Sequence, residues 1–346
     1  MRILHVTSEV APYSKSGGLG DVLADLPVAQ RRRGHDAVVL SPLYGQVPRE
    51  GLVRRLEPTT VRVGWRTFEG HLWAREGLLF FEAPDLFDRA GMYGHADDPL
   101  RFAALCKLAA ALAHDFDVVH LHDWQAGLTA LYLAGARPVV HTIHNLAYQG
   151  ICHPGWADDL EIPHELRRFT GLEFHGNLSL LKAGLVLSSR VTTVSPTYAR
   201  EIVEEPGGAG MAGVLSHRPD GVAGLLNGID PGRFDPAADP ALAAAFSAGD
   251  LAGRARCRAA LQAELGLEDG PVFAVVGRAV HQKGLDLVAA AVPGIVAAGA
   301  AWRCWPTAIA TSSQRCVPWW SRGGWPWCRR STRPCRGATT PGPTSS

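Results

Sequence analysis

Short apolar runs recur along this chain, and a segment with helical spacing follows most of them. Six of these runs occupy residues 3–6, 37–40, 118–121, 139–143, 191–194 and 221–226. Short apolar strands that alternate with helices are typical of a parallel sheet covered on both faces, so the predicted fold class is α/β. Residues 52–82 alternate apolar and polar side chains instead, which predicts a hairpin or meander insertion. Ligands of parallel sheets bind beyond the carboxyl ends of the strands.

The stretch KSGGLGDV, residues 15–22, follows the first run and leads into a predicted helix at residues 21–33. Gly17 and Gly18 allow the main chain to come close to a ligand, and free N–H groups at a helix N-terminus attract anions. Lys15 adds a mobile cation. We therefore predict an anion site, most simply for a phosphate. The alternative is a tight turn with a solvated lysine, because the string matches neither the Walker pattern nor G-x-G-x-x-G.

Polar residues also follow the later strands of the predicted sheet. They are His122 and Asp123, His144 and Asn145, Ser195, and Asn227. Each has a simpler interpretation: Asp123 and Ser195 are good helix caps, and His144 with Asn145 is a plausible hydrogen-bonded loop pair. Because the carboxyl ends of parallel strands face one cleft, the convergence of these residues favours a functional interpretation.

A second alternating unit begins after a segment rich in proline and aspartate at residues 231–240, which predicts an interdomain crossing. A helix at 254–265 and a strand at 271–276 follow. Arg278 and Lys283 then precede a helix at residues 285–291, which repeats the strand, glycine, cation and helix order of the opening stretch. Arg278 offers a planar fork for two phosphate oxygens, and Lys283 a compact charge. Two solvated surface cations are the alternative.

Charge and cysteine spacing exclude several functional classes. The 346 residues carry a net charge of +1, which gives no overall bias toward nucleic acid or membrane partners. The cysteines lack metal-ligand spacing, so no zinc site is expected from them, and neither a carboxylate nor a histidine cluster is visible. No apolar run approaches the roughly 18 residues of a membrane span. Met1 leads straight into a strand without a signal peptide, so a cytoplasmic location is expected.

Six strings of the sequence occur together in one known family. They are HVTSEVAPYSKSGGLGDV, HLHDWQAGL, HTIHNLAYQG, SLLKAGLVLSSRVTTVSPTYAREI, LLNGID and VVGRAVHQKGLDL. From residue 1 to about 300 the chain resembles the bacterial glycogen synthase and plant starch synthase family. The resemblance implies a retaining glycosyltransferase with two Rossmann-like domains facing a cleft, the GT-B type, the second of them incomplete here.

The same resemblance implies roles for residues of the first domain. Lys15 matches the family's lysine on the donor phosphate or on the glucan side of the cleft. Gly17 and Gly18 would let the backbone approach the nucleotide-sugar. Asp123 and His144, with Asn145 beside it, would line the glucose pocket.

In the second unit, the resemblance places Asn227 at the domain crossing and assigns Arg278 and Lys283 to the ADP phosphates. It implies ADP-glucose as donor, glycogen or another α-1,4-glucan as acceptor, and no metal. Charge that develops on the leaving diphosphate would be offset by these cations and by helix N-termini. Nucleic-acid and membrane partners are not expected, and the oligomeric state stays open.

The last 46 residues, from 301 onward, differ from everything before them. They hold six of the ten Trp, four of the seven Cys and seven Arg, but no Lys, Asp or Glu. They show neither helical nor strand periodicity, and their composition is typical of GC-rich coding DNA translated out of frame. The interpretation is a frameshift near codon 300; a natural basic tail is the alternative, although such tails rarely carry six Trp.

We therefore expect three regions: a Rossmann-like domain at 1–222, a linker with the first unit of a second domain at 223–300, and a tail without a defined fold at 301–346. Two functions fit them. One is a glycogen synthase, whose activity we expect to be impaired in this chain because its second domain is incomplete. The other is a non-catalytic remnant that binds glucan or nucleotide weakly.

Overall fold

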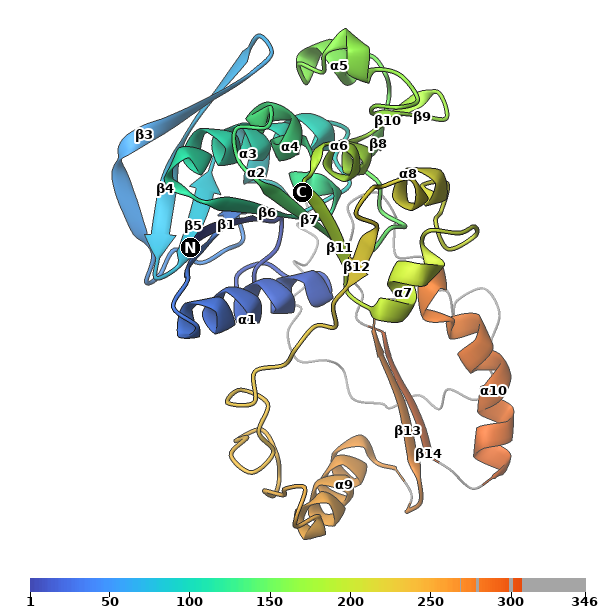
Figure 1. Ribbon diagram of the computed structural model, residues 1–346. Coiled ribbons are helices and arrows are strands. Elements are labelled where there is room, and N and C mark those ends of the chain that lie inside the picture. Colours follow the sequence, from blue (N-terminus) through green and yellow to red (C-terminus); the bar gives the residue numbers. More distant parts are fainter. Residues whose placement is uncertain (268, 278–279, 299–300, 307–346) are drawn as a thin grey trace, which may run out of the picture.

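The computed structural model describes residues 1–267, 269–277, 280–298 and 301–306 of the chain. A nine-stranded sheet forms the centre of the larger, N-terminal part (Figure 1). From one edge to the other its strands are β12 (Val222–Gly224), β11 (Arg190–Thr193), β7 (Val139–Ile143), β6 (Val118–His122), β1 (Arg2–Val6), β2 (Asp36–Pro42), β5 (Leu78–Glu82), β4 (Arg66–Arg75) and β3 (Val53–Val63). Neighbouring strands from β12 to β5 pair in parallel, as the alternation of apolar runs and helices predicted.

The segment predicted as a hairpin insertion, residues 52–82, forms β3, β4 and β5. β3 and β4 pair antiparallel, and so do β4 and β5. However, β5 also pairs in parallel with β2, with Val39 opposite Leu78. The segment is therefore one edge of the central sheet rather than a separate insertion.

Helices cover both faces of this sheet (Figure 1). α1 (Gly18–Arg32) and α7 (Pro196–Glu201) lie on one face. The other face carries α3 (Asp98–Leu112), α4 (Leu128–Leu133) and α6 (Leu180–Leu187), which pack against one another. The parallel strands are buried from both sides for this reason, and Leu4, Val6 and Leu40 are fully enclosed.

Local signals in the sequence explain where these helices begin and end. α1 carries Asp21 in its first turn and two arginines in its last turn, which suits the helix dipole, and Gly34 follows it with a left-handed φ of +84°. α6 begins at Ser179, whose hydroxyl accepts the N–H of Lys182 at 3.2 Å. The helical segment that follows β6 is divided between a 3₁₀ turn, η2 (Trp124–Ala126), and α4.

Shorter elements complete the N-terminal part. They are α2 (Pro84–Phe87), α5 (Trp156–Asp159), α8 (Ala212–Ser216), η1 (Ala113–Asp115), η3 (His164–Leu166), and a small sheet of β8 (Ile151–Cys152), β10 (Asn177–Ser179) and β9 (Glu173–Phe174). Across the described residues, no helix has both the length and the apolar character of a membrane span.

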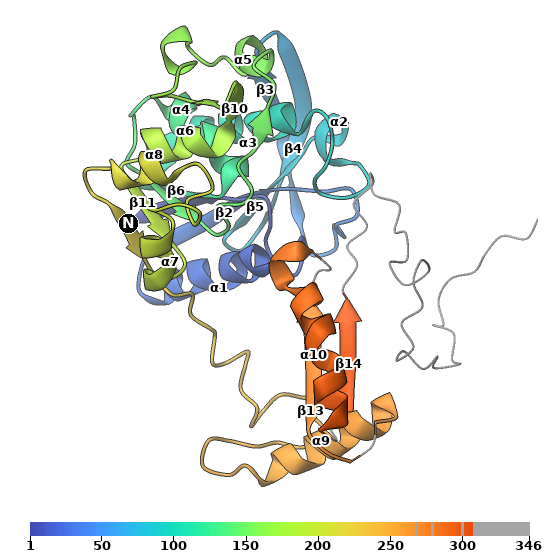
Figure 2. The same ribbon diagram turned by 90° about the vertical axis from the view of Figure 1, so that its right-hand side faces the viewer.

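The second part is much smaller and follows a crossing segment after β12. It contains α9 (Ala252–Leu265), β13 (Val272–Gly277), η4 (His281–Lys283), α10 (Leu285–Ala297) and β14 (Ala301–Pro306). Figure 2 shows α10 lying beside the two strands. β13 and β14 form a two-stranded parallel sheet in which Val272 lies opposite Ala301.

β14 corrects the predicted boundary at residue 300. The tail was expected to lack a fold from residue 301, yet residues 301–306 form a strand. A strand pairs through main-chain N–H and C=O groups, so the unusual composition of this segment does not prevent it from joining β13. Residues 307–346, the rest of the predicted tail, lie outside the described residues.

Candidate active site

Three of the sequence-predicted residues follow three neighbouring strands. Lys15 lies in the turn after β1, Asp123 directly after β6, and His144 directly after β7. These strands are adjacent and parallel in the order β7, β6, β1. Their carboxyl ends therefore meet at one edge of the sheet, where the sequence predicted a common cleft wall.

The glycine-rich turn differs from its prediction in one respect, because a carboxylate of the chain occupies it. Oε2 of the buried Glu9 accepts the N–H groups of Ser16 at 2.6 Å and Gly17 at 3.3 Å. Its other oxygen accepts the hydroxyls of Ser16 and, at 2.6 Å, of Tyr93. Two of the N–H groups that were expected to be free for an anion are therefore bonded to Glu9. The sequence pattern did not reveal this contact, because Glu9 precedes the turn by several residues.

The outer side of the turn is nevertheless open. A Cβ atom added at Gly17 or Gly18 would meet no atom within 4 Å, so neither glycine is required by packing within the chain. Lys15 is about half exposed and pairs with Asp21, its Nζ lying 2.7 Å from Oδ2. The two glycines and the lysine thus leave main chain and charge accessible from outside the turn.

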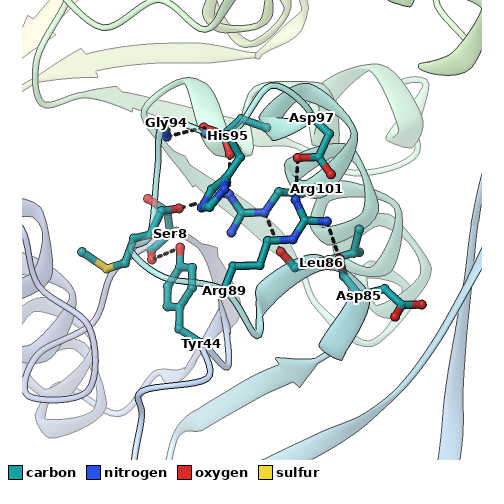
Figure 3. Close-up of polar contacts among 11 residues, drawn as sticks. Ser8, Tyr44, Asp85, Leu86, Arg89, Gly94, His95, Asp97 and Arg101 are labelled. Atoms are coloured by element: carbon teal, nitrogen blue, oxygen red, sulfur yellow. Dashed lines mark hydrogen bonds and ion pairs between the residues drawn. The ribbon is translucent and has the colours of Figure 1, made fainter. Parts of the chain in front are cut away.

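A buried arginine holds the loop between α2 and α3, which carries Tyr93 to its contact with Glu9. Figure 3 shows Arg101 beside Leu86 at one end of this loop. Arg101, fully buried on α3, donates to the carbonyl oxygens of Leu86 at 2.5 Å and Met92 at 3.3 Å and forms an ion pair with Asp98. Asp98 in turn accepts the N–H groups of Gly94 and His95. Because both ends of the loop are tied to α3, Tyr93 is held over the turn.

Asp123 is positioned across the sheet rather than along its own chain. Its Oδ1 accepts the N–H groups of His144 at 2.7 Å and Asn145 at 3.3 Å, and it does not cap the 3₁₀ turn that follows it. Its φ of +58° is uncommon for a residue with a side chain. Burial raises the pKa of Asp123 to about 7, the two N–H groups oppose this rise, and the charge of Glu9 adds to it.

His144 lies at the end of a row of histidines. Its Nε2 is 3.0 Å from Nδ1 of His122, whose Nε2 is 3.1 Å from Nδ1 of His5. Burial lowers the pKa of His144 and of His5 to about 4, and that of His122 well below its usual value. His144 is therefore neutral at pH 7, so its ring offers hydrogen bonds rather than a charge.

The second part of the molecule meets the same edge. Asn145 and Gln282 exchange side-chain hydrogen bonds, from Nδ2 to Oε1 at 3.1 Å and from Nε2 to Oδ1 at 3.3 Å. Gln282 belongs to η4, so the exposed Lys283 beside it is brought to the turn of His144. Arg278, the other predicted phosphate ligand, lies outside the described residues.

The remaining sequence-predicted residues do not join this group. Ser195 caps α7, accepting the N–H of Tyr198 at 3.2 Å, so its simpler interpretation is confirmed. Asn227 is exposed in the crossing segment, and no described hydrogen bond links it to Lys15, Asp123 or His144. A surface cavity of about 630 Å³ lies beside α1, but none of the predicted site residues lines it.

Comparison with known proteins identifies the family. Residues 2–217 match the model of the starch synthase catalytic domain. The chain belongs to the starch synthase family. It is 43% identical over 324 residues to the glycogen synthase of Yersinia pestis (strain Pestoides F), covering 86% of this chain and 67% of that protein. The glycogen synthase of Erwinia tasmaniensis is 41% identical over 326 residues, with the same coverage.

A solved structure extends the likeness into the second part. The catalytic domain of starch synthase IV from Arabidopsis thaliana, bound to ADP and acarbose, superposes with a TM-score of 0.82 at 30% identity, covering 88% of this chain and 68% of that one. This starch synthase family member is therefore a glycosyltransferase with the GT-B fold, and it spans about two thirds of the length of these relatives.

One expectation about this family member was wrong. The sequence suggested no histidine cluster, yet ring nitrogens of His5, His120 and His122 lie within 4.8 Å of one another. Residues 5 and 120 are far apart in sequence, and only the pairing of β1 with β6 brings them together. The facing nitrogens of His5 and His122 are already hydrogen bonded, and Nε2 of His120 is 2.7 Å from the hydroxyl of Thr142.

Proposed function

We propose that the chain transfers glucose from ADP-glucose to the non-reducing end of an α-1,4-glucan, with retention of configuration. The observation that carries the proposal is the convergence at one sheet edge of Lys15, Asp123 and His144, together with Lys283 through the contact between Asn145 and Gln282. The relatives support it, since two are glycogen synthases and the starch synthase of Arabidopsis was solved with ADP and acarbose.

The cations serve the leaving group in this proposal. Because Glu9 occupies two N–H groups of the glycine-rich turn, the negative charge of the diphosphate falls mainly to Lys283 and Arg278, assisted by Lys15. Fixed positive charge stabilises the charge that develops as the bond to the sugar breaks. Side-chain cations do this without a metal, and we propose that none is required.

The sugar lies on the other side of the site. Gly17 and Gly18 leave room for it, and the neutral ring of His144 offers a hydrogen bond to a hydroxyl. Asp123 holds the turn of His144 and Asn145 in place through its two main-chain hydrogen bonds. We further propose a cytoplasmic location, because the described cysteines Cys106, Cys152 and Cys257 are free thiols, as is usual in a reducing compartment.

The decisive assay is transfer of labelled glucose from ADP-glucose to glycogen. Replacing Lys283 by Ala removes one charge-assisted contact to the diphosphate, and we expect kcat/KM to fall roughly 30- to 1000-fold, or about 2–4 kcal/mol. Lys107→Ala is the matched control, because Lys107 lies on α3, away from the site, and pairs with Glu161. Equal losses in both variants would contradict the assignment of Lys283.

A second candidate is a protein that binds nucleotide-sugar or glucan without turnover. The exposure of the second part favours it, since Val276 on β13 is 76% exposed. Calorimetric titration with ADP-glucose and with a malto-oligosaccharide separates the two. Binding together with no detectable transfer, under conditions in which a glycogen synthase relative is active, would replace the first proposal by this one.

A further inference from the structure

Four side chains form one continuous hydrogen-bonded row beneath the candidate active site. It begins at Gln30 in the last turns of α1, whose Oε1 lies 2.7 Å from Nε2 of His5. It continues from Nδ1 of His5 to Nε2 of His122 at 3.1 Å, and from Nδ1 of His122 to Nε2 of His144 at 3.0 Å. The row therefore connects a helix that covers the sheet with the residue at the sheet's carboxyl edge.

The sheet itself builds this row. His5 on β1 lies opposite His120 on β6, so His5 and His122 are on the same face of the sheet. His122 lies opposite Thr142 on β7, which places His144, two residues on, on that face too. His5 and His122 are 0% and 1% exposed, so bulk solvent does not reach their rings.

Each neutral imidazole carries one donor and one acceptor nitrogen, so one end of the row determines all the others. In the structure Oε1 of Gln30 faces Nε2 of His5, and because an amide oxygen accepts, Nε2 of His5 donates in this arrangement. Nδ1 of His5 then accepts from Nε2 of His122, and Nδ1 of His122 accepts from Nε2 of His144. All three rings are thereby held with the proton on Nε2.

The free end of the row lies at the candidate site. Nδ1 of His144 has no hydrogen-bond partner among the described residues, and it is absent from the fully buried atoms that lack one. Because the single ring proton of His144 lies on Nε2 and is donated to His122, Nδ1 carries a lone pair and can only accept a hydrogen bond. A sugar hydroxyl is the class of ligand group that an acceptor nitrogen next to a glucose pocket recognises.

We propose that Gln30, His5 and His122 are positioning residues that hold His144 as the Nε2–H tautomer and so present Nδ1 as an acceptor for a hydroxyl of the bound sugar. The inference rests on the proposed function for its ligand, but the tautomer itself is independent of any ligand. Burial keeps the three rings neutral, which the row requires, because a doubly protonated ring would donate from both nitrogens.

A metal ion bound by His5, His120 and His122 is the competing interpretation of the same cluster. An ion held by the two facing nitrogens, Nδ1 of His5 and Nε2 of His122, would need both lone pairs at the same time, whereas the row places a proton between these two atoms. The two arrangements therefore exclude each other, and the position of the protons decides between them.

The test is ¹⁵N spectroscopy of the histidine rings in the full 346-residue chain without added ligand. Long-range ¹H–¹⁵N correlations distinguish the two tautomers, and single His→Gln variants assign the signals of His5, His122 and His144. We expect the Nε2–H form for all three at pH 7.5. In Gln30→Met the fixed acceptor is gone, so His144 should show a mixture of tautomers. Ala29→Met, an exposed change beside it on α1, should leave the spectra unchanged.

Kinetics supply the second readout. In the glucose-transfer assay, Gln30→Met should raise KM for ADP-glucose about 5- to 10-fold, the value of roughly one hydrogen bond, with a much smaller change in kcat. An Nδ1–H form of His144 in the unmodified chain, identical tautomers in Gln30→Met, or stoichiometric zinc whose removal by EDTA shifts the His5 and His122 signals would each overturn the proposal. If the chain transfers no glucose, the proposed function fails, but the tautomers of the three histidines still show whether the hydrogen-bonded row exists.

Discussion

The chain contains the same local design twice, and the two copies are supported very differently. β1 leads through a glycine-rich turn with Lys15 into α1, and β13 leads through η4 with Lys283 into α10. β1 has β2 and β6 as neighbours, and Leu4 and Val6 are fully buried. Within the described part of the chain β13 pairs with β14 alone, and its Phe273 and Val276 are 46% and 76% exposed.

The comparison shows what a strand–turn–helix pattern specifies by itself. It determines the order of elements and the place of the cation, because both follow from spacing and from glycine positions. It does not determine how firmly the unit is held, since most of the stability of a strand or helix comes from the apolar surface it buries against its neighbours. Side chains that must keep fixed positions for catalysis are therefore held more firmly on the β1 side of the candidate site than on the β13 side.

Amide hydrogen exchange should give the largest difference between the two units. In β1, β6 and β7 the amides open only with the whole domain, and a domain stability of roughly 5–15 kcal/mol implies protection factors of at least about 10⁴. The amides of β13 should exchange within about tenfold of the unfolded rate, because a two-stranded sheet with exposed apolar side chains is marginal. Similar protection of β1 and β13 would show that the second unit is stabilised in a way the structure does not reveal.

The same contrast explains which parts of the fold the sequence could predict. The strands of the parallel sheet were predicted because each is a short apolar run, and Lys15, Asp123 and His144 were found because they follow such runs. Their meeting at one edge required only the general rule that parallel strands share a carboxyl end.

Pairings between distant residues could not be predicted in this way. Glu9 in the glycine-rich turn, the row from Gln30 to His144, and the contact of Asn145 with Gln282 all depend on which elements become neighbours. A histidine in an apolar strand carries no mark that tells a core residue from a functional one. β14 was missed for a similar reason, because its partner β13 and not its own composition makes it a strand.

Acid should destabilise the N-terminal part selectively. Burial lowers the pKa values of five histidines, which are His5, His120, His122, His141 and His144. A lowered folded-state pKa means that the unfolded chain binds protons more readily, so this stability is complete above pH 6.5 and is lost as the pH falls toward 4. For His5 alone, with a pKa of about 4, the loss at pH 5 is about 2 kcal/mol.

Asp123 works in the opposite direction. Its folded-state pKa of about 7 lies above the unfolded value, so its contribution is present at low pH and is lost as the pH rises through 7. The stability lost through the five histidines outweighs the stability gained through one carboxyl group. We therefore expect the urea midpoint of unfolding to decrease when the pH is lowered from 7.5 to 5. The exposed His281 of the second unit provides the control, because His281→Gln should leave this pH dependence unchanged. A midpoint that rises on acidification would contradict the neutral state of the buried rings.

The contact between Asn145 and Gln282 should give the smallest effect, although it joins the turn of His144 and Asn145 to η4 through side chains. Two neutral hydrogen bonds at an exposed site contribute about 1 kcal/mol or less, because water replaces them when they break. Gln282→Ala and Asn145→Ala should each change kcat/KM less than Lys283→Ala does, and the double variant should lose little more than Asn145→Ala alone, with a coupling energy of roughly 0.5–1 kcal/mol. Strictly additive losses would mean that the two side chains act separately and that Lys283 is brought to the site without this contact. A coupling energy well above about 1 kcal/mol, the upper end expected for such a contact, would mean instead that the unit of β13 and α10 depends on the N-terminal part for its position. The two units would then behave as one cooperative structure.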